Sequence, residues 1–249
     1  MSGKGTHTIY GLHAVRAMLE RHPERVQTVR LAAHREDERA RALESLARRQ
    51  QRPLRRVDAA SLRRELGEVA HQGVAAEIVP LPAQSEDELI EAVTAAAAPL
   101  VLALDGVQDP HNLGACLRTA DACGVLAVVV PRDRAAQLTA AARKVAAGAA
   151  DMTPVIAVTN LVRTLKLLKE ANLWVVGADG QADTAAHAVD LTGARVLVLG
   201  AEGAGLRQLT RAHCDFMVRL PLLGVVESLN VSVAAGMVLY EALRQRGRA

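Results

Sequence analysis

Short apolar runs alternate with helical patterns between residues 100 and 220, and this alternation constrains the fold more than any other feature of the chain. The runs are rich in Val, Leu and Ala, and they cover residues 100–104, 125–130, 155–158, 173–176, 196–199 and 216–220. Nearly continuous apolar strands that alternate with helices are typical of a parallel sheet covered on both faces. The sequence therefore predicts an α/β fold with a parallel sheet for its second part.

Three glycine-bearing polar segments lie where these apolar runs end and helical patterns begin. They are Asp109–Ala120, Val198–Leu206 and Leu220–Gly236. Because parallel strands end at one edge of a sheet, the loops that follow them meet there and commonly hold a ligand. We therefore expect the three segments to form one site.

The first segment predicts a helix in which one residue does not fit a buried face. Asn112 can cap this helix, and Gly114 allows another group to approach the backbone closely. Arg118 stands among apolar neighbours, so its guanidinium must reach solvent or an anion. A salt bridge to Asp121 or Asp105 is the structural alternative to a functional role.

The second segment is a glycine turn that follows a strand. Gly200, Gly203 and Gly205 surround Glu202, and their spacing differs from the dinucleotide-binding pattern G-x-G-x-x-G. A nucleotide-dependent oxidoreductase would carry that pattern after its first strand, with an acidic residue further on. The turn therefore favours close backbone approach to a ligand and disfavours an oxidoreductase.

The third segment places Ser228 and Asn230 at the expected start of the last helix, from about residue 228 to 246. Ser and Asn most often cap helices at such positions. The functional interpretation is that their side chains and the free N–H groups of the helix face an oxygen-rich or anionic ligand.

Charge is distributed unevenly along the chain. Residues 1–75 carry fifteen Lys and Arg against nine Asp and Glu, whereas residues 76–249 carry fifteen against eighteen. Arginine supplies nearly all of the excess, and its planar guanidinium suits bidentate contacts with phosphate. The first part therefore favours nucleic acid as a partner, although solvated helix faces with i,i+4 ion pairs produce similar runs.

A proline-bearing polar stretch, PLPAQSEDE, divides the chain. The part before it has helical and strand patterns typical of a compact α/β unit. The helical patterns cover residues 11–21 and 35–49, and the strand patterns cover 26–31, 54–57 and 74–79. We expect a first domain at 1–77, a linker and helix at 78–98, and a second domain at 99–249.

Composition excludes several classes of protein. No apolar run approaches the roughly 18 residues of a membrane span, and the first residues lack an apolar stretch for a secretory signal. Three cysteines favour reduced thiols, and no His/Cys spacing resembles a zinc site. Cys116 and Cys123 are interpreted as buried small hydrophobic residues. We therefore expect a cytoplasmic protein with no metal and no membrane partner.

The three segments together carry a family resemblance. The pattern N-x-G-x-x-x-R begins at Asn112, G-A-E-G begins at Gly200 and S-L-N begins at Ser228. In this order and spacing they resemble the motifs of the SpoU, or TrmH, class of RNA ribose 2'-O-methyltransferases, over essentially the whole second domain. IYGLHAV at 9–15, HQGV at 71–74 and the ending YEALRQR resemble the bacterial branch that methylates a guanosine ribose in 23S ribosomal RNA.

The resemblance implies a fold, a cofactor and partners. It implies a trefoil-knotted α/β methyltransferase domain with a parallel sheet, preceded by a small L30e-like α/β RNA-binding domain. It also implies S-adenosylmethionine as methyl donor, S-adenosylhomocysteine as product, no metal, 23S ribosomal RNA as substrate, and a homodimer formed through the methyltransferase domain.

The resemblance also implies functional residues, motif by motif. The catalytic candidates are Asn112, Arg118, Glu202, Ser228 and Asn230. Cofactor contacts fall on Gly200, Leu220 and Leu229, largely through backbone groups.

The implied chemistry is an in-line attack by a ribose 2'-hydroxyl on the sulfonium methyl. Arg118 is assigned the part of base or activator, a demanding role because a free guanidinium has a pKa above about 12. Our hypothesis is that Arg118 either has a lowered pKa at the moment of reaction, or positions an RNA phosphate and stabilises the developing alkoxide.

Two other functions stay open at this point. The first is methylation of transfer RNA by an enzyme of the same class. The second is a non-catalytic RNA-binding protein of ribosome assembly, which would keep the basic first domain but would not need Arg118, Glu202 and Asn230 together.

Overall fold

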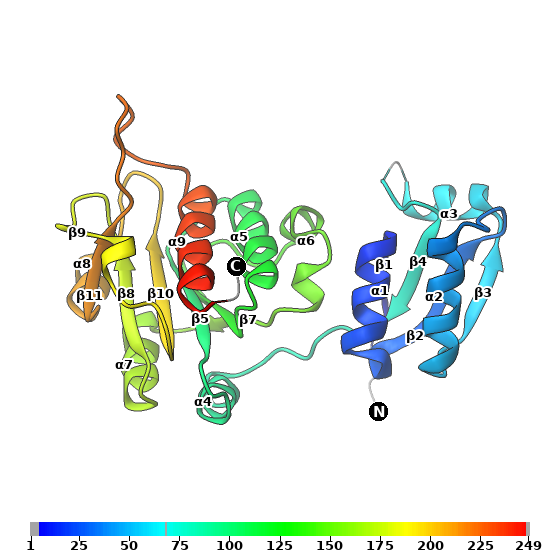
Figure 1. Ribbon diagram of the computed structural model, residues 1–249, viewed down its shortest axis with the longest axis horizontal. Coiled ribbons are helices and arrows are strands. Elements are labelled where there is room, and N and C mark those ends of the chain that lie inside the picture. The colour runs from blue at the N-terminus through cyan, green and yellow to red at the C-terminus, as the bar shows by residue number, and fades with distance from the viewer. Residues whose placement is uncertain (1–4, 68, 248–249) are drawn as a thin grey trace. The chain divides into compact units, whose positions relative to one another are not determined.

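The chain forms two compact units, each built around a sheet of its own. The computed structural model describes residues 5–67 and 69–247. The units are Met1–Pro82 and Ala83–Ala249 (Figure 1).

The first unit is a four-stranded sheet with helices packed against it. Its elements in order are β1 (His7–Tyr10), α1 (Leu12–Arg21), a 3-10 turn (Pro23–Arg25), β2 (Val26–Ala32), α2 (Glu38–Arg49), β3 (Leu54–Val57), α3 (Ala59–Leu66) and β4 (Val74–Ile78). The strand order is β1-β4-β2-β3, in which β4 is antiparallel to both neighbours and β2 is parallel to β3. The sequence patterns missed β1 and α3, because each of these elements buries a single side chain, Ile9 and Leu62 respectively.

The second unit alternates strands and helices along most of its length. Its elements in order are α4 (Glu86–Ala95), β5 (Leu100–Asp105), α5 (Pro110–Ala122), β6 (Ala127–Pro131), α6 (Ala140–Ala146), β7 (Val155–Val158), α7 (Leu161–Glu170), β8 (Trp174–Ala178), β9 (Thr184–Ala185), β10 (Arg195–Gly200), α8 (Gln208–Ala212), β11 (Phe216–Arg219) and α9 (Val231–Gln245). Two 3-10 turns lie at Ala149–Asp151 and Ala186–Ala188.

The strands of the second unit form one sheet in the order β7-β6-β5-β10-β8-β11-β9, and every pairing between neighbours is parallel. All six apolar runs of the sequence form strands of this sheet, which confirms the predicted α/β fold. The two-residue strand β9 was not predicted, because it is too short to carry a hydrophobic pattern.

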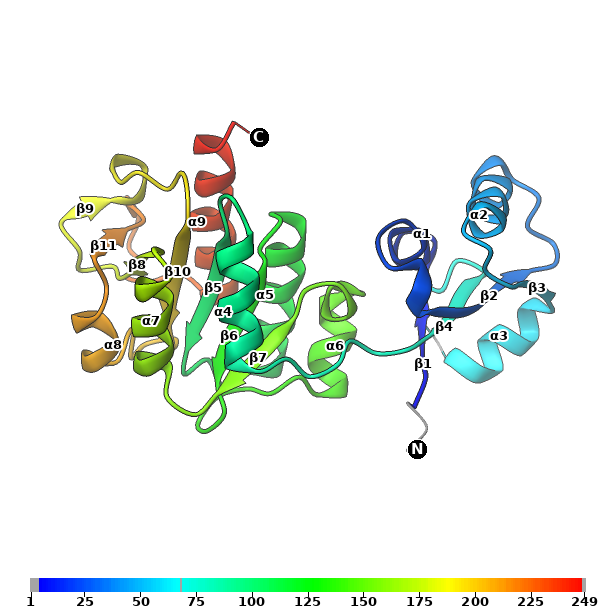
Figure 2. The ribbon, with the colours of Figure 1, turned by 90° about the horizontal axis from the view of Figure 1, so that it is seen from below.

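Helices cover both faces of this sheet (Figure 2). Alternate side chains along a strand point to opposite faces, so that Leu102 and Leu104 pack with α5, α6 and α9. Val101 and Ala103 pack instead with α4 and α7. The two buried layers explain why the strands read as continuous apolar runs.

Two further features bear on the sequence-based expectations. Cys116 is fully buried, as expected. The expectation that Cys123 is buried is wrong, because Cys123 is partly exposed at the end of α5. Cys214 is also partly exposed, and all three are free thiols. No helix within residues 5–67 and 69–247 is long and apolar enough to cross a membrane.

Candidate active site

The three polar segments follow β5, β10 and β11, which are parallel members of the same sheet. An ion pair joins the end of β5, just before the first segment, to Arg207, the residue that follows the second segment. The backbone N of Arg207 donates to Asp105 Oδ2 at 2.9 Å, and its Nε donates to Oδ1 at 2.6 Å. Asp105 is buried, so its charge is balanced by an arginine from a loop more than 100 positions away.

One polar side chain from each segment meets in a single hydrogen-bonded cluster. Asn112 Nδ2 donates to Glu202 Oε1 at 2.9 Å. Asn230 Nδ2 donates both to Asn112 Oδ1, at 2.9 Å, and to Glu202 Oε1, at 2.6 Å. The side chains of the Asn112–Glu202–Asn230 cluster, which were predicted to form one site, are therefore in direct contact.

Asn112 takes part in this cluster from inside α5. The prediction that Asn112 caps the helix is wrong, because α5 begins two residues earlier and Asp109 is its N-cap, accepting from the backbone N of His111. Asn112 is 9% exposed and uses its amide for Glu202 and Asn230. A buried amide needs partners of this kind, since an unpaired one is costly.

Gly114 sets how closely α5 packs on α6. A Cβ atom at this position would lie 2.5 Å from the carbonyl oxygen of Ala142 and 2.8 Å from Cβ of Val145. The expected close approach is confirmed, and the approaching group is the backbone of α6.

Asn230 has two roles in the structure. It is the N-cap of α9, where its Oδ1 accepts from the backbone N of Ser232 at 2.9 Å, while its Nδ2 holds the cluster. The helix therefore begins at Val231 rather than near Ser228. Ser228 is exposed and makes no hydrogen bond with any part of the chain that the structure describes.

Arg118 lies on α5 and is exposed to solvent. Within residues 5–67 and 69–247 it makes no hydrogen bond or ion pair. The alternative of a salt bridge to Asp105 is wrong, because Arg207 occupies that carboxylate. The Arg118 guanidinium is therefore available to an anionic ligand.

The glycine turn after β10 folds back on the strand end. The backbone of Ala201 bridges that of Gly205, and Gly203 and Gly205 have φ angles of 74° and 65°. A Cβ on Gly200 would lie 2.0 Å from the carbonyl carbon of Gly205, so this position excludes every side chain. The turn presents Glu202 at its tip, towards Asn112 and Asn230.

The residues with expected cofactor contacts lie on two loops of this edge. Gly200 ends β10, while Leu220 follows β11 and Leu229 precedes the cap of α9. Residues 221–229 form no helix or strand, and the carbonyl oxygen of Glu227 would lie 3.8 Å from a Cβ on Gly180. Loops after β8, β10 and β11 therefore offer backbone N–H and C=O groups at the same edge.

Cys116 lies one helical turn from Asn112, on the buried side of α5. Burial raises the pKa of its thiol to about 12, and the nearby Glu202 carboxylate adds to the rise. A neutral thiol is not a nucleophile. No group of three His, Cys, Asp or Glu side chains within the described residues is arranged to hold a metal ion.

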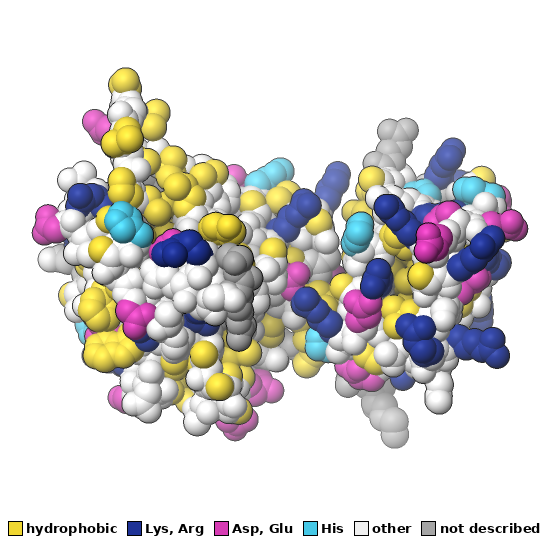
Figure 3. Space-filling view, in the orientation of Figure 1, with side chains coloured by type: hydrophobic (Ala, Val, Ile, Leu, Met, Phe, Trp, Pro, Cys, Tyr) yellow, Lys and Arg dark blue, Asp and Glu magenta, His cyan; other side chains and the backbone are white. Residues whose placement is uncertain are grey.

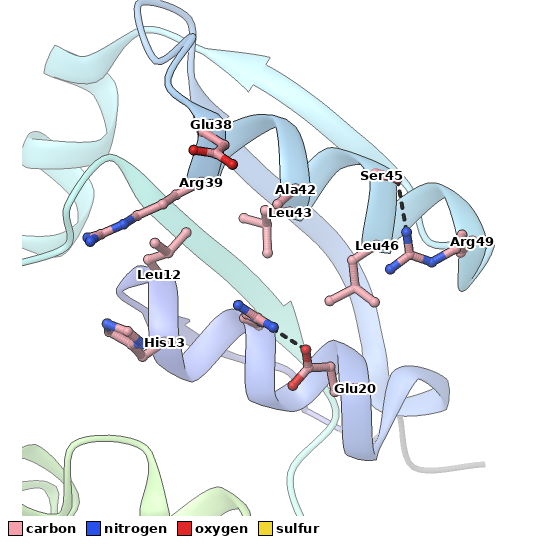
Figure 4. A pocket seen from close by; sticks show the side chains of 11 residues that line it. Leu12, His13, Glu20, Glu38, Arg39, Ala42, Leu43, Ser45, Leu46 and Arg49 are labelled. Atoms are coloured by element: carbon pink, nitrogen blue, oxygen red, sulfur yellow. Dashed lines mark hydrogen bonds and ion pairs between the residues drawn. The ribbon is translucent and has the colours of Figure 1, made fainter.

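The first unit contains a groove of about 420 Å³ between α1 and α2 (Figure 4). Leucine side chains form its floor, and the rim carries the basic side chains His13, Arg16, Arg39 and Arg49. Two carboxylates, Glu20 and Glu38, share the rim. Arginine side chains are spread over this unit (Figure 3), which suits a polyanionic partner.

Sequence reasoning missed the Asp105–Arg207 pair as part of the site. A signal was present, because a single carboxylate at the end of an otherwise apolar strand must find a cation when it is buried. The spacing of residues along the sequence did not identify Arg207 as that cation.

Two family models match the chain. Residues 99–240 match the SpoU rRNA Methylase family, and residues 8–84 match a family described as RNA 2'-O ribose methyltransferase substrate binding.

Individual relatives and solved structures agree with these matches. The chain is 54% identical over 242 residues to the 23S rRNA (guanosine-2'-O-)-methyltransferase RlmB of Pseudomonas aeruginosa, with 96% of each chain covered. It is 49% identical over 238 residues to the Escherichia coli K12 protein of the same name, covering 96% of this chain and 98% of that one. The structure of the SpoU methyltransferase AviRb from Streptomyces viridochromogenes with AdoMet aligns with a TM-score of 0.70 at 25% identity, over 97% of this chain and 90% of the other.

Proposed function

Because the chain belongs to the SpoU family of RNA methyltransferases, we propose that it methylates the 2'-oxygen of a guanosine ribose in 23S ribosomal RNA, with S-adenosylmethionine as the methyl donor. One observation carries the proposal: the Asn112–Glu202–Asn230 cluster joins all three family motifs by direct hydrogen bonds. The near-complete coverage of the RlmB relatives supports 23S ribosomal RNA as the substrate.

The loops at this edge fit S-adenosylmethionine, which has an amino-acid end and an adenine end that pair with backbone groups. Residues 221–229 lie outside helices and strands, and Gly200 leaves room for no side chain. We propose that Gly200, Leu220 and Leu229 hold the methyl donor, largely through their N–H and C=O groups. When bound, S-adenosylmethionine would supply a methyl group that is activated by the positive charge on the sulfur. After methyl transfer the sulfur is left as a neutral thioether in S-adenosylhomocysteine.

The protein's remaining tasks are to align the ribose and to remove one proton from its 2'-hydroxyl. Alignment alone contributes roughly 7–11 kcal/mol in favourable systems. The three side chains of the cluster fix one another, because each amide and the carboxylate has its partner. We propose that Asn112, Glu202 and Asn230 form the preorganised wall against which the target ribose lies, with exposed Ser228 contacting the ligand.

Arg118 is the proposed contact for developing negative charge. Its guanidinium is exposed and has no partner within the described residues, so binding RNA breaks no existing ion pair. A guanidinium offers several N–H donors to a phosphate and to the ribose oxygen as the hydroxyl gives its proton to solvent water. Its availability supports the activating role.

We also propose a division of labour between the two parts of the chain. Residues 1–77 bind RNA, 78–98 link the parts, and 99–249 carry out methyl transfer. Arg39 and Arg49 at the rim of the groove between α1 and α2 support the first assignment, as does the substrate-binding family match at 8–84. The L30e-like character of the first domain and the trefoil knot of the second stay predictions.

A homodimer through the methyltransferase unit completes the proposal. Three apolar side chains of α9 are exposed on one helical face, with Val233 at 50%, Met237 at 46% and Tyr240 at 60%. Their spacing of four and three residues places them in one stripe. Such a stripe supports contact with a second copy, and we place the protein in the cytoplasm with its ribosomal RNA substrate.

Transfer of labelled methyl from S-adenosylmethionine to undermodified 23S RNA and, separately, to transfer RNA tests the function. We expect 2'-O-methylguanosine on 23S RNA by nucleoside analysis, and loss of this product with Arg118→Ala. Product on transfer RNA alone would keep the chemistry and overturn the substrate. No product on either RNA, together with no binding of the methyl donor, would favour the non-catalytic RNA-binding alternative.

A further inference from the structure

A second cavity, of about 200 Å³, lies at the same edge of the sheet in the second unit. Ala201 and Ala204, which flank Glu202, line one side, and Gln108, just before α5, lines another. Two arginines, Arg134 and Arg207, also line the cavity. In the same measure one water needs only about 10–15 Å³, so the cavity has room for a group much larger than water.

Arg207 is held in place by a buried carboxylate. Its backbone N and its Nε both donate to Asp105, at 2.9 and 2.6 Å, while its side chain is 52% exposed. Among the described residues that line the cavity, Asp105 is the one carboxylate, and Arg207 already engages it. The cavity therefore has an excess of positive charge.

Arg134 lines the cavity from the loop that follows β6. Its φ angle is 54°, in the left-handed region that residues with a side chain adopt rarely. Arg134 is exposed, and it makes no hydrogen bond or ion pair within residues 5–67 and 69–247. Backbone strain of this kind persists only where surrounding contacts impose it, and it is concentrated at functional sites.

The contacts that impose this conformation are visible in the loop. Gln137 Nε2 donates to the carbonyl oxygens of Pro131 and Arg132, at 3.0 and 3.2 Å. The backbone N of Ala136 donates to the carbonyl oxygen of Val107 at 2.7 Å, which attaches the loop to the end of β5. These hydrogen bonds hold the loop that carries Arg134 in a defined conformation against the end of β5.

Gly106 lies between the two arginines. A Cβ on this residue would lie 3.9 Å from Arg207 Nη2 and 4.0 Å from the carbonyl oxygen of Arg134. Gly106 itself therefore places no side chain between the loop that carries Arg134 and the guanidinium of Arg207.

We propose that this cavity binds a phosphate group of the RNA backbone next to the target ribose, through the guanidinium groups of Arg134 and Arg207. The inference rests on the proposed function, and it adds two substrate-binding residues outside the three family motifs. Guanidinium groups suit phosphate because their N–H donors match its oxygens bidentately. Contacts to phosphate fix register, and here they hold the ribose beside Glu202.

Arg134→Gly is the sharpest variant for a test. Glycine adopts a positive φ without strain, so this change removes the cation and preserves the loop. Arg132→Ala is the matched control, because it removes an equal charge from the same loop at an exposed residue that does not line the cavity. Arg134→Lys keeps the charge and loses the bidentate geometry.

RNA affinity, its salt dependence and affinity for S-adenosylmethionine are measured for all four proteins with an undermodified 23S fragment. For Arg134→Gly we expect roughly tenfold weaker RNA binding or more, and a salt slope lower by about 0.7–0.9. Arg132→Ala is expected to retain the wild-type values and Arg134→Lys to retain the slope with weaker binding. Affinity for S-adenosylmethionine should be the same in all four.

Two results would overturn the phosphate site. One is equal RNA affinity and salt slope in Arg134→Gly and Arg132→Ala. The other is weaker binding of S-adenosylmethionine by Arg134→Gly with RNA binding intact, which would assign the cavity to the donor's carboxylate. Failure of the phosphate site and failure of the proposed function can be told apart with the wild-type protein. If wild-type protein methylates the 23S fragment, the proposed function holds, even if the Arg134 variants bind RNA normally.

Discussion

Asn230 donates an amide hydrogen to Glu202, with Nδ2 2.6 Å from Oε1, while its own Oδ1 caps α9 through the backbone N of Ser232. One side chain therefore joins the start of the last helix to the glycine turn after β10. The Asn112–Glu202–Asn230 cluster and the start of α9 depend on the same amide.

Replacing Asn230 by Asp should separate these two dependences. Aspartate still caps the helix, but it lacks the Nδ2 donor and places a second carboxylate against Glu202. We expect methyl transfer at saturating RNA to fall about a hundredfold because the cluster loses its geometry. Single-turnover kinetics would measure this, and wild-type turnover in Asn230→Asp would exclude a functional cluster.

Asn230→Ala serves as the comparison, since alanine removes the cap as well as the donor. Loss of a cap costs about 0.5–2 kcal/mol of stability. Urea unfolding should therefore show a loss of about this size for Asn230→Ala.

Arg118 should affect turnover without affecting stability. It is exposed and has no partner within the described residues, so Arg118→Ala should change the free energy of unfolding by less than about 0.5 kcal/mol. We expect turnover to fall about a hundredfold or more, because a group that meets charge in the transition state is lost. If Arg118→Lys kept near-wild-type turnover and methyl-donor affinity, the specific role of the guanidinium would be wrong.

Replacing the helical glycines Gly114 and Gly236 by alanine should have opposite effects on stability. A Cβ at Gly114 would lie 2.5 Å from the carbonyl oxygen of Ala142, so Gly114→Ala should destabilise the protein by about 1–3 kcal/mol. At Gly236 the nearest atom, Thr119 Cγ2, is 3.7 Å away, and Gly236→Ala should stabilise by up to about 1 kcal/mol. Urea denaturation tests both, and equal effects would contradict the packing of α5 on α6.

The exposed stripe on α9 predicts the state of association. Met237→Glu places a charge in the middle of the stripe, and we expect it to convert a dimer into a monomer in light scattering after size-exclusion chromatography. Leu209→Glu, at a residue of α8 that is 68% exposed, is the control and should leave the mass unchanged. A wild-type monomer would contradict the proposed homodimer.

Cys116 predicts a loss of stability at alkaline pH. In the unfolded chain its thiol ionises from about pH 8.5, whereas burial raises the pKa in the folded protein to about 12. Between these values the folded state holds the proton that the unfolded state releases, so stability falls as pH rises through this window. The free energy of unfolding should fall less steeply with pH in Cys116→Ala, by up to about 1.4 kcal/mol per pH unit; parallel curves would contradict the raised pKa.

Much of the fold was predictable from local pattern. The strand at 155–158 was predicted with the bounds it has, because four apolar residues between polar segments leave little choice. The short elements β1, α3 and β9 were not predictable, because each draws its stability from the neighbour it pairs with or packs against. The predicted site residues Asn112, Glu202 and Asn230 are brought into contact, whereas Ser228 and Arg118 stay outside the hydrogen-bonded cluster.

The sequence by itself determined that strands and helices alternate and that three polar segments end parallel strands, because hydrophobic periodicity is a local property. Only the tertiary structure decided that Asn112 bonds Glu202, 90 residues away, instead of capping its own helix. Only it placed Arg134 and Arg207 around one cavity. The physical reason is that a side chain's partner depends on which strand ends become neighbours, and that order is set by packing of the whole sheet.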